Sequence, residues 1–163
     1  MTRPRFASYR SMVLVACGLI GAGCAHHDTY QERANLIKNH ADAFYDSLKT
    51  NRVESAIRDN EQIEAMASQM GDTVRKRAVQ QGTTAVEREL ALMNTANEAA
   101  ATNWLALGQY FAIKRQYSKA RVTYRRVIDT YTNPTDRPYR EQALRSLRDL
   151  DMLDPSNTTT KKP

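Results

Sequence analysis

Glycine and proline are scarce in this sequence, with 6 and 5 residues among 163. Both residues interrupt helices, so their scarcity leaves room for long ones. Histidine and cysteine are scarcer still, with 3 and 2 residues. So few of these side chains offer no credible Ser/His/Asp or Cys/His catalytic set, and no glycine-rich phosphate loop is present. We therefore predict no catalytic residues and no enzymatic activity.

The sequence also lacks a concentrated block of positive charge. Its net charge is +6, but acidic residues are interspersed among the lysines and arginines. Nucleic-acid binding needs a concentrated basic face, so we predict no nucleic-acid partner. Arginines do gather toward the C-terminal end, where they form a solvated face or meet acidic lipid or an acidic partner. These are Arg121, Arg125, Arg126, Arg140, Arg145 and Arg148.

The first 23 residues differ from the rest of the chain. Three arginines precede an uncharged, mostly apolar run, residues 11–20. This run is too short to span a bilayer, which takes about 20 residues, but it suits the apolar core of a signal peptide, about 7–15 residues long. We predict a signal peptide over 1–23, whose removal lowers the net charge by three, from +6 to +3.

Small residues and a cysteine follow this run, as Ile20-Gly-Ala-Gly-Cys24. This segment resembles the lipobox of bacterial lipoproteins, although Gly21 departs from the usual leucine. Leu14-Val-Ala-Cys17 is a rival that fits the local pattern better, but its apolar run would be only six residues long. The alternative is an ordinary secreted protein with a Cys17–Cys24 disulfide or free thiols.

The lipobox resemblance implies a covalent diacylglycerol and an N-acyl lipid on Cys24, and we expect no other cofactor. His26 and His27 lie beside this cysteine, but acylation would remove the thiolate that a metal needs, so we predict no metal site. The resemblance also implies a lipid-anchored protein of the cell envelope. Because Ala25 follows the cysteine, it implies the outer membrane, facing the periplasm, if the organism is Gram-negative.

Apolar residues in the mature chain recur at helical spacing, which predicts an all-α domain. We expect a tether over 24–29, a helical domain over 30–153 and a disordered tail over 154–163. Thr29 with Glu32, and Thr84 with Glu87, match capping boxes. Gly71 is a typical helix stop, Asp72 and Asp136 are candidate caps, and Gly82 marks a further break. The expected helices cover about 29–49, 52–70, 99–115, 118–130 and 138–153, and residues 73–100 are expected to form two helices with the break near Gly82.

One set of residues in the C-terminal third is spaced as in a helical hairpin. It comprises Trp104, Leu107, Gly108, Phe111, Tyr117, Ala120, Tyr124 and Val127. This pattern resembles the tetratricopeptide repeat (TPR), W-x2-L-G-x2-Y followed by a small residue and an aromatic. The unit would cover 101–134, with 138–153 as a capping helix. Phe111, Val127 and Pro134 depart from the usual pattern.

The TPR resemblance implies antiparallel helical hairpins in a right-handed superhelix, and a small helical bundle is the alternative. A lone repeat cannot bury both of its faces. Residues 44–70 echo the pattern, with Val53, Ala56 and Ile63 matching three core positions, although Asn60 replaces Tyr124. For this N-terminal half, a degenerate repeat and an irregular bundle remain equally open.

In TPR proteins the first helix of each repeat lines a concave groove that binds a peptide or helix. The resemblance places Thr102, Leu105, Gln109, Ala112 and Ile113 on that side. Leu105 and Ile113 would then be exposed apolar residues, and the alternative, that the N-terminal helices fold over them as core, is equally open. We therefore expect a scaffold that binds other envelope proteins. The alternative is a structural lipoprotein that associates with peptidoglycan or with itself. The sequence leaves the oligomeric state open.

Two polar features have ordinary structural interpretations. His40 lies on the apolar stripe of the first expected helix and is predicted to be half-buried. Glu141 and Arg145 are four residues apart on the last helix and are predicted to form an ion pair there.

Overall fold

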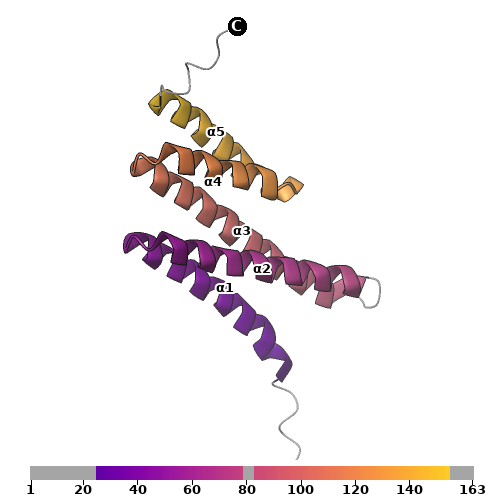
Figure 1. Cartoon of the computed structure of the whole chain (residues 1–163). Coiled ribbons are helices and arrows are strands. Elements are labelled where there is room, and N and C mark those ends of the chain that lie inside the picture. Colours follow the sequence, from indigo (N-terminus) through magenta and orange to yellow (C-terminus); the bar gives the residue numbers. More distant parts are fainter. Residues whose placement is uncertain (1–24, 79–82, 155–163) are drawn as a thin grey trace, which may run out of the picture.

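The computed structural model describes residues 25–78 and 83–154. Five helices fill these two ranges, which contain no strand: α1 (Ala25–Lys49), α2 (Val53–Ala78), α3 (Thr83–Ile113), α4 (Tyr117–Thr130) and α5 (Arg137–Leu153). A 3₁₀ turn, η1 (Pro134–Asp136), joins the last two. Consecutive helices form antiparallel hairpins that stack on one another, with α5 at one end and α1 at the other (Figure 1). The predicted all-α class is confirmed.

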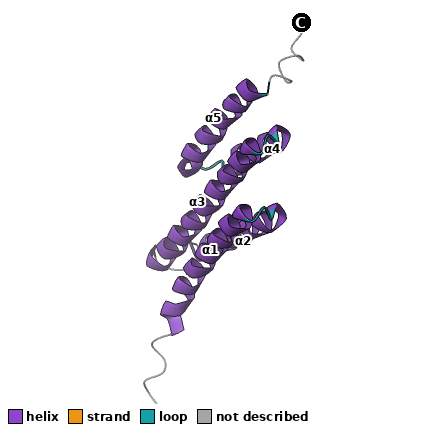
Figure 2. Cartoon of the chain, turned by 90° about the vertical axis from the view of Figure 1, so that its left-hand side faces the viewer, coloured by secondary structure: helices purple, strands orange, loops and turns teal. Residues whose placement is uncertain are grey.

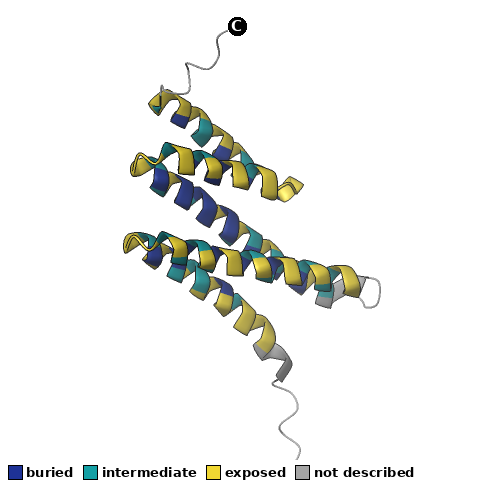
Figure 3. Ribbon diagram, in the orientation of Figure 1, coloured by how far each residue is buried: buried dark blue, intermediate teal, exposed yellow. Residues whose placement is uncertain are grey.

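Helix α3 is the centre of this stack and contacts the other four helices. Its second half is buried on most of its circumference, whereas α1, α2, α4 and α5 are exposed along one side (Figure 3). Small side chains at Ala96, Ala100 and Ala101, all fully buried, let neighbouring helices approach α3 closely. The alanine-rich segment of the sequence is therefore the centre of the core.

The α1–α2 and α3–α4 hairpins turn in the same way. Asn51 and Arg115 each adopt a left-handed backbone, with φ of 61° and 57°. The Asn51 amide donates to the Leu48 carbonyl, as the Arg115 amide does to the Ala112 carbonyl. Three neighbouring turn bonds, donated by the amides of Thr50, Arg52 and Ala56, each have a counterpart 64 residues later in the chain. Both turns lie on the same side of the molecule (Figure 2).

Burial follows the same correspondence between the two hairpins. Ala56 and its counterpart Ala120 are both fully buried, as are Ile63 and Val127. Asn60, which occupies the position of Tyr124, is also buried. The N-terminal half is therefore a hairpin with the same turn and the same buried register as the C-terminal one.

Two predicted helix boundaries are wrong. Helix α2 passes through Gly71 and Asp72 and ends at Ala78, and Gly71 has no left-handed backbone. A Cβ at Gly71 would lie 3.3 Å from the Met93 sulfur, so this glycine allows close packing of α2 on α3 instead of ending a helix. Likewise, α3 starts at Thr83 and not near residue 99. Its first half contributes Leu92 and Ala96 to the buried core, so this segment is stabilised as part of one long helix.

The predicted caps also need correction. Helix α1 begins at Ala25, so Thr29 lies inside it and the expected tether is mostly helical. Asp136 precedes α5 but its side chain makes no capping hydrogen bond, while Pro138 lies in the first turn as expected. Thr84 lies inside α3, although its side chain, like Gly82, falls outside what the structure describes.

The predicted lipidation residue Cys24, its rival Cys17, the predicted signal peptide and residues 155–163 lie outside the described ranges, as do the side chains of His26 and His27. Within those ranges, no helix combines the length and apolar character that a membrane span requires.

Candidate functional site

The α3–α4 hairpin is held by a close approach between Gly108 and Tyr124. A Cβ on Gly108 would lie 2.5 Å from the Tyr124 Cε1 atom and 2.8 Å from two further ring carbons. No real Cβ tolerates such distances, so the tyrosine ring occupies the space that a side chain at 108 would take. The other predicted repeat-core residues, Trp104, Leu107, Phe111, Ala120 and Val127, are buried, and Tyr117 is partly buried.

The Tyr124 hydroxyl reaches beyond α3 to α5. It lies near Ser146 and Asp149, and burial raises the pKa of its phenol above the ordinary value. At this point α3 and α5 leave a hollow of about 260 Å³, which we call the α3–α5 hollow. It is lined by Leu105, Gln109, Ala112, Tyr124, Gln142, Ser146, Asp149, Leu150 and Leu153.

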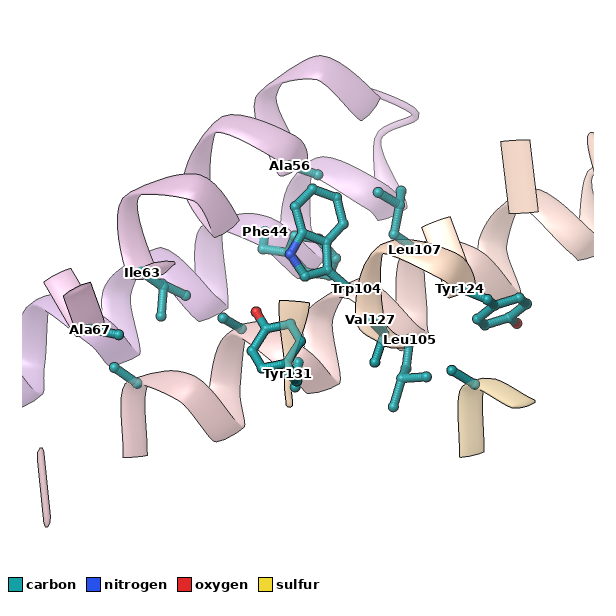
Figure 4. Packing of buried hydrophobic residues seen from close by; sticks show 14 of the residues in the cluster. Phe44, Ala56, Ile63, Ala67, Trp104, Leu105, Leu107, Tyr124, Val127 and Tyr131 are labelled. Carbon is teal, nitrogen blue, oxygen red and sulfur yellow. The ribbon is translucent and has the colours of Figure 1, made fainter. Parts of the chain in front are cut away.

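Three of the five predicted groove residues, Leu105, Gln109 and Ala112, line this hollow. Thr102 and Gln109 are exposed, Ala112 is half-buried and Ile113 is 73% exposed. Leu105 is only 7% exposed, so of the two arrangements that the sequence left open for this residue, the structure has the covered one. Its side chain points toward α5, on the opposite side of α3 from Trp104 (Figure 4). Helix α5 thus narrows the predicted groove to a smaller hollow.

A polar cluster around Glu64 joins the two hairpins. The Glu64 carboxylate accepts hydrogen bonds from Trp104 Nε1 at 2.7 Å and from the Tyr131 hydroxyl at 2.8 Å. Arg126 donates to it at 2.7 Å, and the guanidinium lies 4.1 Å from the centre of the Trp104 ring. One carboxylate on α2 therefore fixes an aromatic ring of α3 and two side chains from the end of α4.

A second polar contact crosses the same interface. Asn60 of α2 donates to the Ala100 carbonyl at 3.1 Å, and its own side-chain oxygen accepts from Asn103 at 2.9 Å. Asn60 and Asn103 are 0% and 2% exposed. A buried amide pair is costly unless every partner is in place, so this pair favours a single register between α2 and α3.

Three of the six arginines of the predicted basic face make local contacts. Arg121 bonds Asp151 of α5 at 3.1 Å and Asp154, directly after α5, at 2.9 Å. Arg126 bonds Glu64, and Arg140 donates to the Tyr131 carbonyl. Glu141 pairs with Arg137 at 2.7 Å and not with Arg145 as expected. The hydrogen bond from Arg137 lowers the pKa of the Glu141 carboxyl.

His40 is half-buried as predicted, and its Nδ1 atom lies 3.1 Å from an Asp59 carboxylate oxygen on α2. This contact gives the histidine a structural partner within the α1–α2 hairpin. Among the described residues, no three histidine, cysteine or acidic side chains are grouped as metal ligands would be.

Glu64, Asn60 and Asn103 were not singled out as site residues from the sequence. Glu64 lies among exposed glutamates of the same helix, and its partners are 40 or more residues away. Asn60 did carry a signal, since it is a polar residue at a position where the repeat pattern requires a large buried one.

No protein-family model matches the chain, and neither does any curated protein or solved structure.

Proposed function

We propose that this protein is a membrane-anchored envelope lipoprotein whose helical domain acts as a TPR-like protein–protein interaction scaffold. The anchor is the lipid on Cys24, and the role is non-catalytic. The lipobox-like segment supports the anchor, and the two equivalent hairpins with their Gly108–Tyr124 contact support the repeat-like scaffold.

The observation that carries the binding role is the α3–α5 hollow. It combines amide and hydroxyl groups, from Gln109, Gln142 and Ser146, with the exposed apolar side chain of Leu153. Amides can pair with the backbone of an incoming segment, and apolar surface beside them can take one of its side chains. We therefore propose that a short extended or helical segment of another envelope protein binds there.

The hollow is tested by crosslinked capture from native membranes. We compare the wild type with Gln109→Arg, which places a long charged side chain in the hollow, and with Gln69→Arg as the control. Gln69 is exposed on α2 and does not line the α3–α5 hollow. Loss of a discrete partner in Gln109→Arg alone supports the proposal. If all three proteins capture the same set, the structural lipoprotein without a binding groove replaces it.

A further inference from the structure

A second hollow lies at the C-terminal end of α4. The second half of α2 and the first half of α3 form its other walls. Its volume is about 510 Å³, larger than the α3–α5 hollow. We call it the α2–η1 hollow. It is lined by Glu64, Ala67, Ser68, Gly71, Val74, Arg75, Met93, Asn97, Thr130, Tyr131, Asn133 and Asp136.

Asp136 is the unusual group in this lining. It is only 6% exposed, and within the described ranges its carboxylate has neither a hydrogen bond nor an ion pair. Although it directly precedes α5, it makes no capping bond to that helix. Among the described residues, every polar side-chain atom that is fully enclosed has a hydrogen-bond partner. Because the Asp136 carboxylate has no partner, its oxygens are not fully enclosed, and they are exposed to the hollow that Asp136 lines. A nearly buried carboxylate is costly without a cation or donors.

The other charged groups around the hollow already have partners. Glu64 accepts from Trp104, Tyr131 and Arg126, and Arg75 is bonded to Asp72. The carboxylate of Asp136 is therefore the charge that the lining leaves without a counterion. The hollow is thus suited to a cation.

The remaining lining indicates which kind of cation. Ala67, Val74 and Met93 provide apolar surface that suits an aliphatic stem, while Asn97 and Asn133 offer amide oxygens as acceptors. Calcium and magnesium take six or more oxygen ligands, and the described residues hold no group of three metal-ligating side chains. One carboxylate with amide acceptors and an apolar wall fits an organic cation better.

We propose that the α2–η1 hollow binds an alkylammonium or alkylguanidinium group, with Asp136 as its counterion. Such a group occurs on lysine and arginine side chains and on free amines. The ammonium or guanidinium donates to Asp136 and to the amide oxygens, and the alkyl stem lies along α2 and α3. This site is separate from the α3–α5 hollow and does not depend on the role proposed for it.

The probe is n-pentylammonium, titrated into the full chain while backbone amide resonances are followed by NMR. n-Pentanol is the uncharged control. We expect saturable shifts at Gly71, Asn97 and Asn133, with a dissociation constant of roughly 1–10 mM for so small a ligand. Pentanol should give no saturable shift. Binding of both probes alike would show an apolar hollow without a cation site and would overturn the proposal.

Asp136→Asn removes the charge and keeps the shape, and Asp42→Asn, at an exposed position on α1, is the matched control. We expect Asp136→Asn to weaken binding at least about tenfold, since a charge-assisted hydrogen bond is lost, and Asp42→Asn to leave it unchanged. Ser68→Met puts a larger side chain into the lining and leaves Asp136 itself unchanged, and should also abolish binding. Unchanged binding in Asp136→Asn and in Ser68→Met would contradict the proposal.

The source of the cation is distinguished with acetyl-Gly-Lys-Gly-amide. Binding tighter than that of n-pentylammonium indicates a lysine side chain of a protein, and weaker binding indicates a free amine. Both results support the site, whereas binding of neither probe rejects it.

Discussion

Tyr124 lies across the backbone of Gly108 so closely that a Cβ at position 108 would be 2.5 Å from its ring. The tyrosine then extends to Ser146 on α5. One side chain of α4 therefore reaches both neighbouring helices, and it does so only because the residue between them is glycine. This contact links the packing of the hairpin to the shape of the α3–α5 hollow.

Gly108→Ala should lower the free energy of unfolding by about 1–3 kcal/mol, because the ring of buried Tyr124 must move. Gly71→Ala is the control, since its new Cβ meets only the flexible Met93 side chain at 3.3 Å. Better helix propensity should raise its stability by about 0.5–1 kcal/mol. Denaturant unfolding followed by circular dichroism measures both. Equal effects of the two substitutions would show that the Gly108 contact is not tight.

Glu64→Ala should destabilise the fold by about 2–3 kcal/mol, because it leaves the Trp104 and Tyr131 donors without their partner. Glu61→Ala is the matched control on the same helix. Glu61 is 4.0 Å from Arg126 and about half exposed, so its loss should cost less than about 0.5 kcal/mol. Comparable losses in the two variants would mean that the Glu64 cluster does not join the hairpins.

Because of Tyr131, the free energy of unfolding should depend on pH in the alkaline range. Burial, and then the nearby Glu64 carboxylate, raises the pKa of its phenol well above 10.0. The unfolded chain thus loses this proton first as the pH rises. The stability from Tyr131 is complete below about pH 10 and declines as the pH rises from there toward the folded-state pKa.

Tyr131→Phe has no phenolic proton and isolates this effect. Unfolding free energies of the wild type and the variant, measured across pH 8–11, should converge above about pH 10. A constant difference over the whole range would show that the phenol ionises at the same pH in both states.

Arg115→Gly should stabilise the second hairpin by about 0.5–1 kcal/mol, because a left-handed backbone strains any residue with a Cβ. Arg115→Ala keeps the Cβ and should give no such gain, so it is the control. Thermal unfolding by circular dichroism is the measurement. A gain from alanine as large as that from glycine would indicate that the arginine side chain, and not the φ of 57°, is the cause.

Local patterns in the sequence predicted the helical class, the C-terminal hairpin and its core. Trp104, Gly108 and Tyr124 follow a spacing that reflects packing within one hairpin, so a short stretch of sequence is enough to predict that hairpin and its core. The same reasoning failed at Gly71, where a glycine that lies inside α2 and faces Met93 of α3 resembles a helix stop. Local sequence cannot distinguish these two uses, because the second depends on a helix that follows later in the chain.

The candidate sites were less predictable than the fold. Burial of Leu105 depends on where α5 lies, and the function of Glu64 depends on donors from α3 and α4. Asp136 was expected to be a cap, since aspartate often precedes a helix. Only the tertiary arrangement shows that its carboxylate opens into a hollow instead.

The central claim is that a lipid on Cys24 holds this helical scaffold in the cell envelope. Metabolic labelling with a fatty acid tests it directly, with Cys24→Ala and Cys17→Ala compared against the wild type. We expect the wild type and Cys17→Ala to be labelled and to sediment with membranes, and Cys24→Ala to be neither. Labelling that persists in Cys24→Ala, or no labelling of the wild type, would contradict the account.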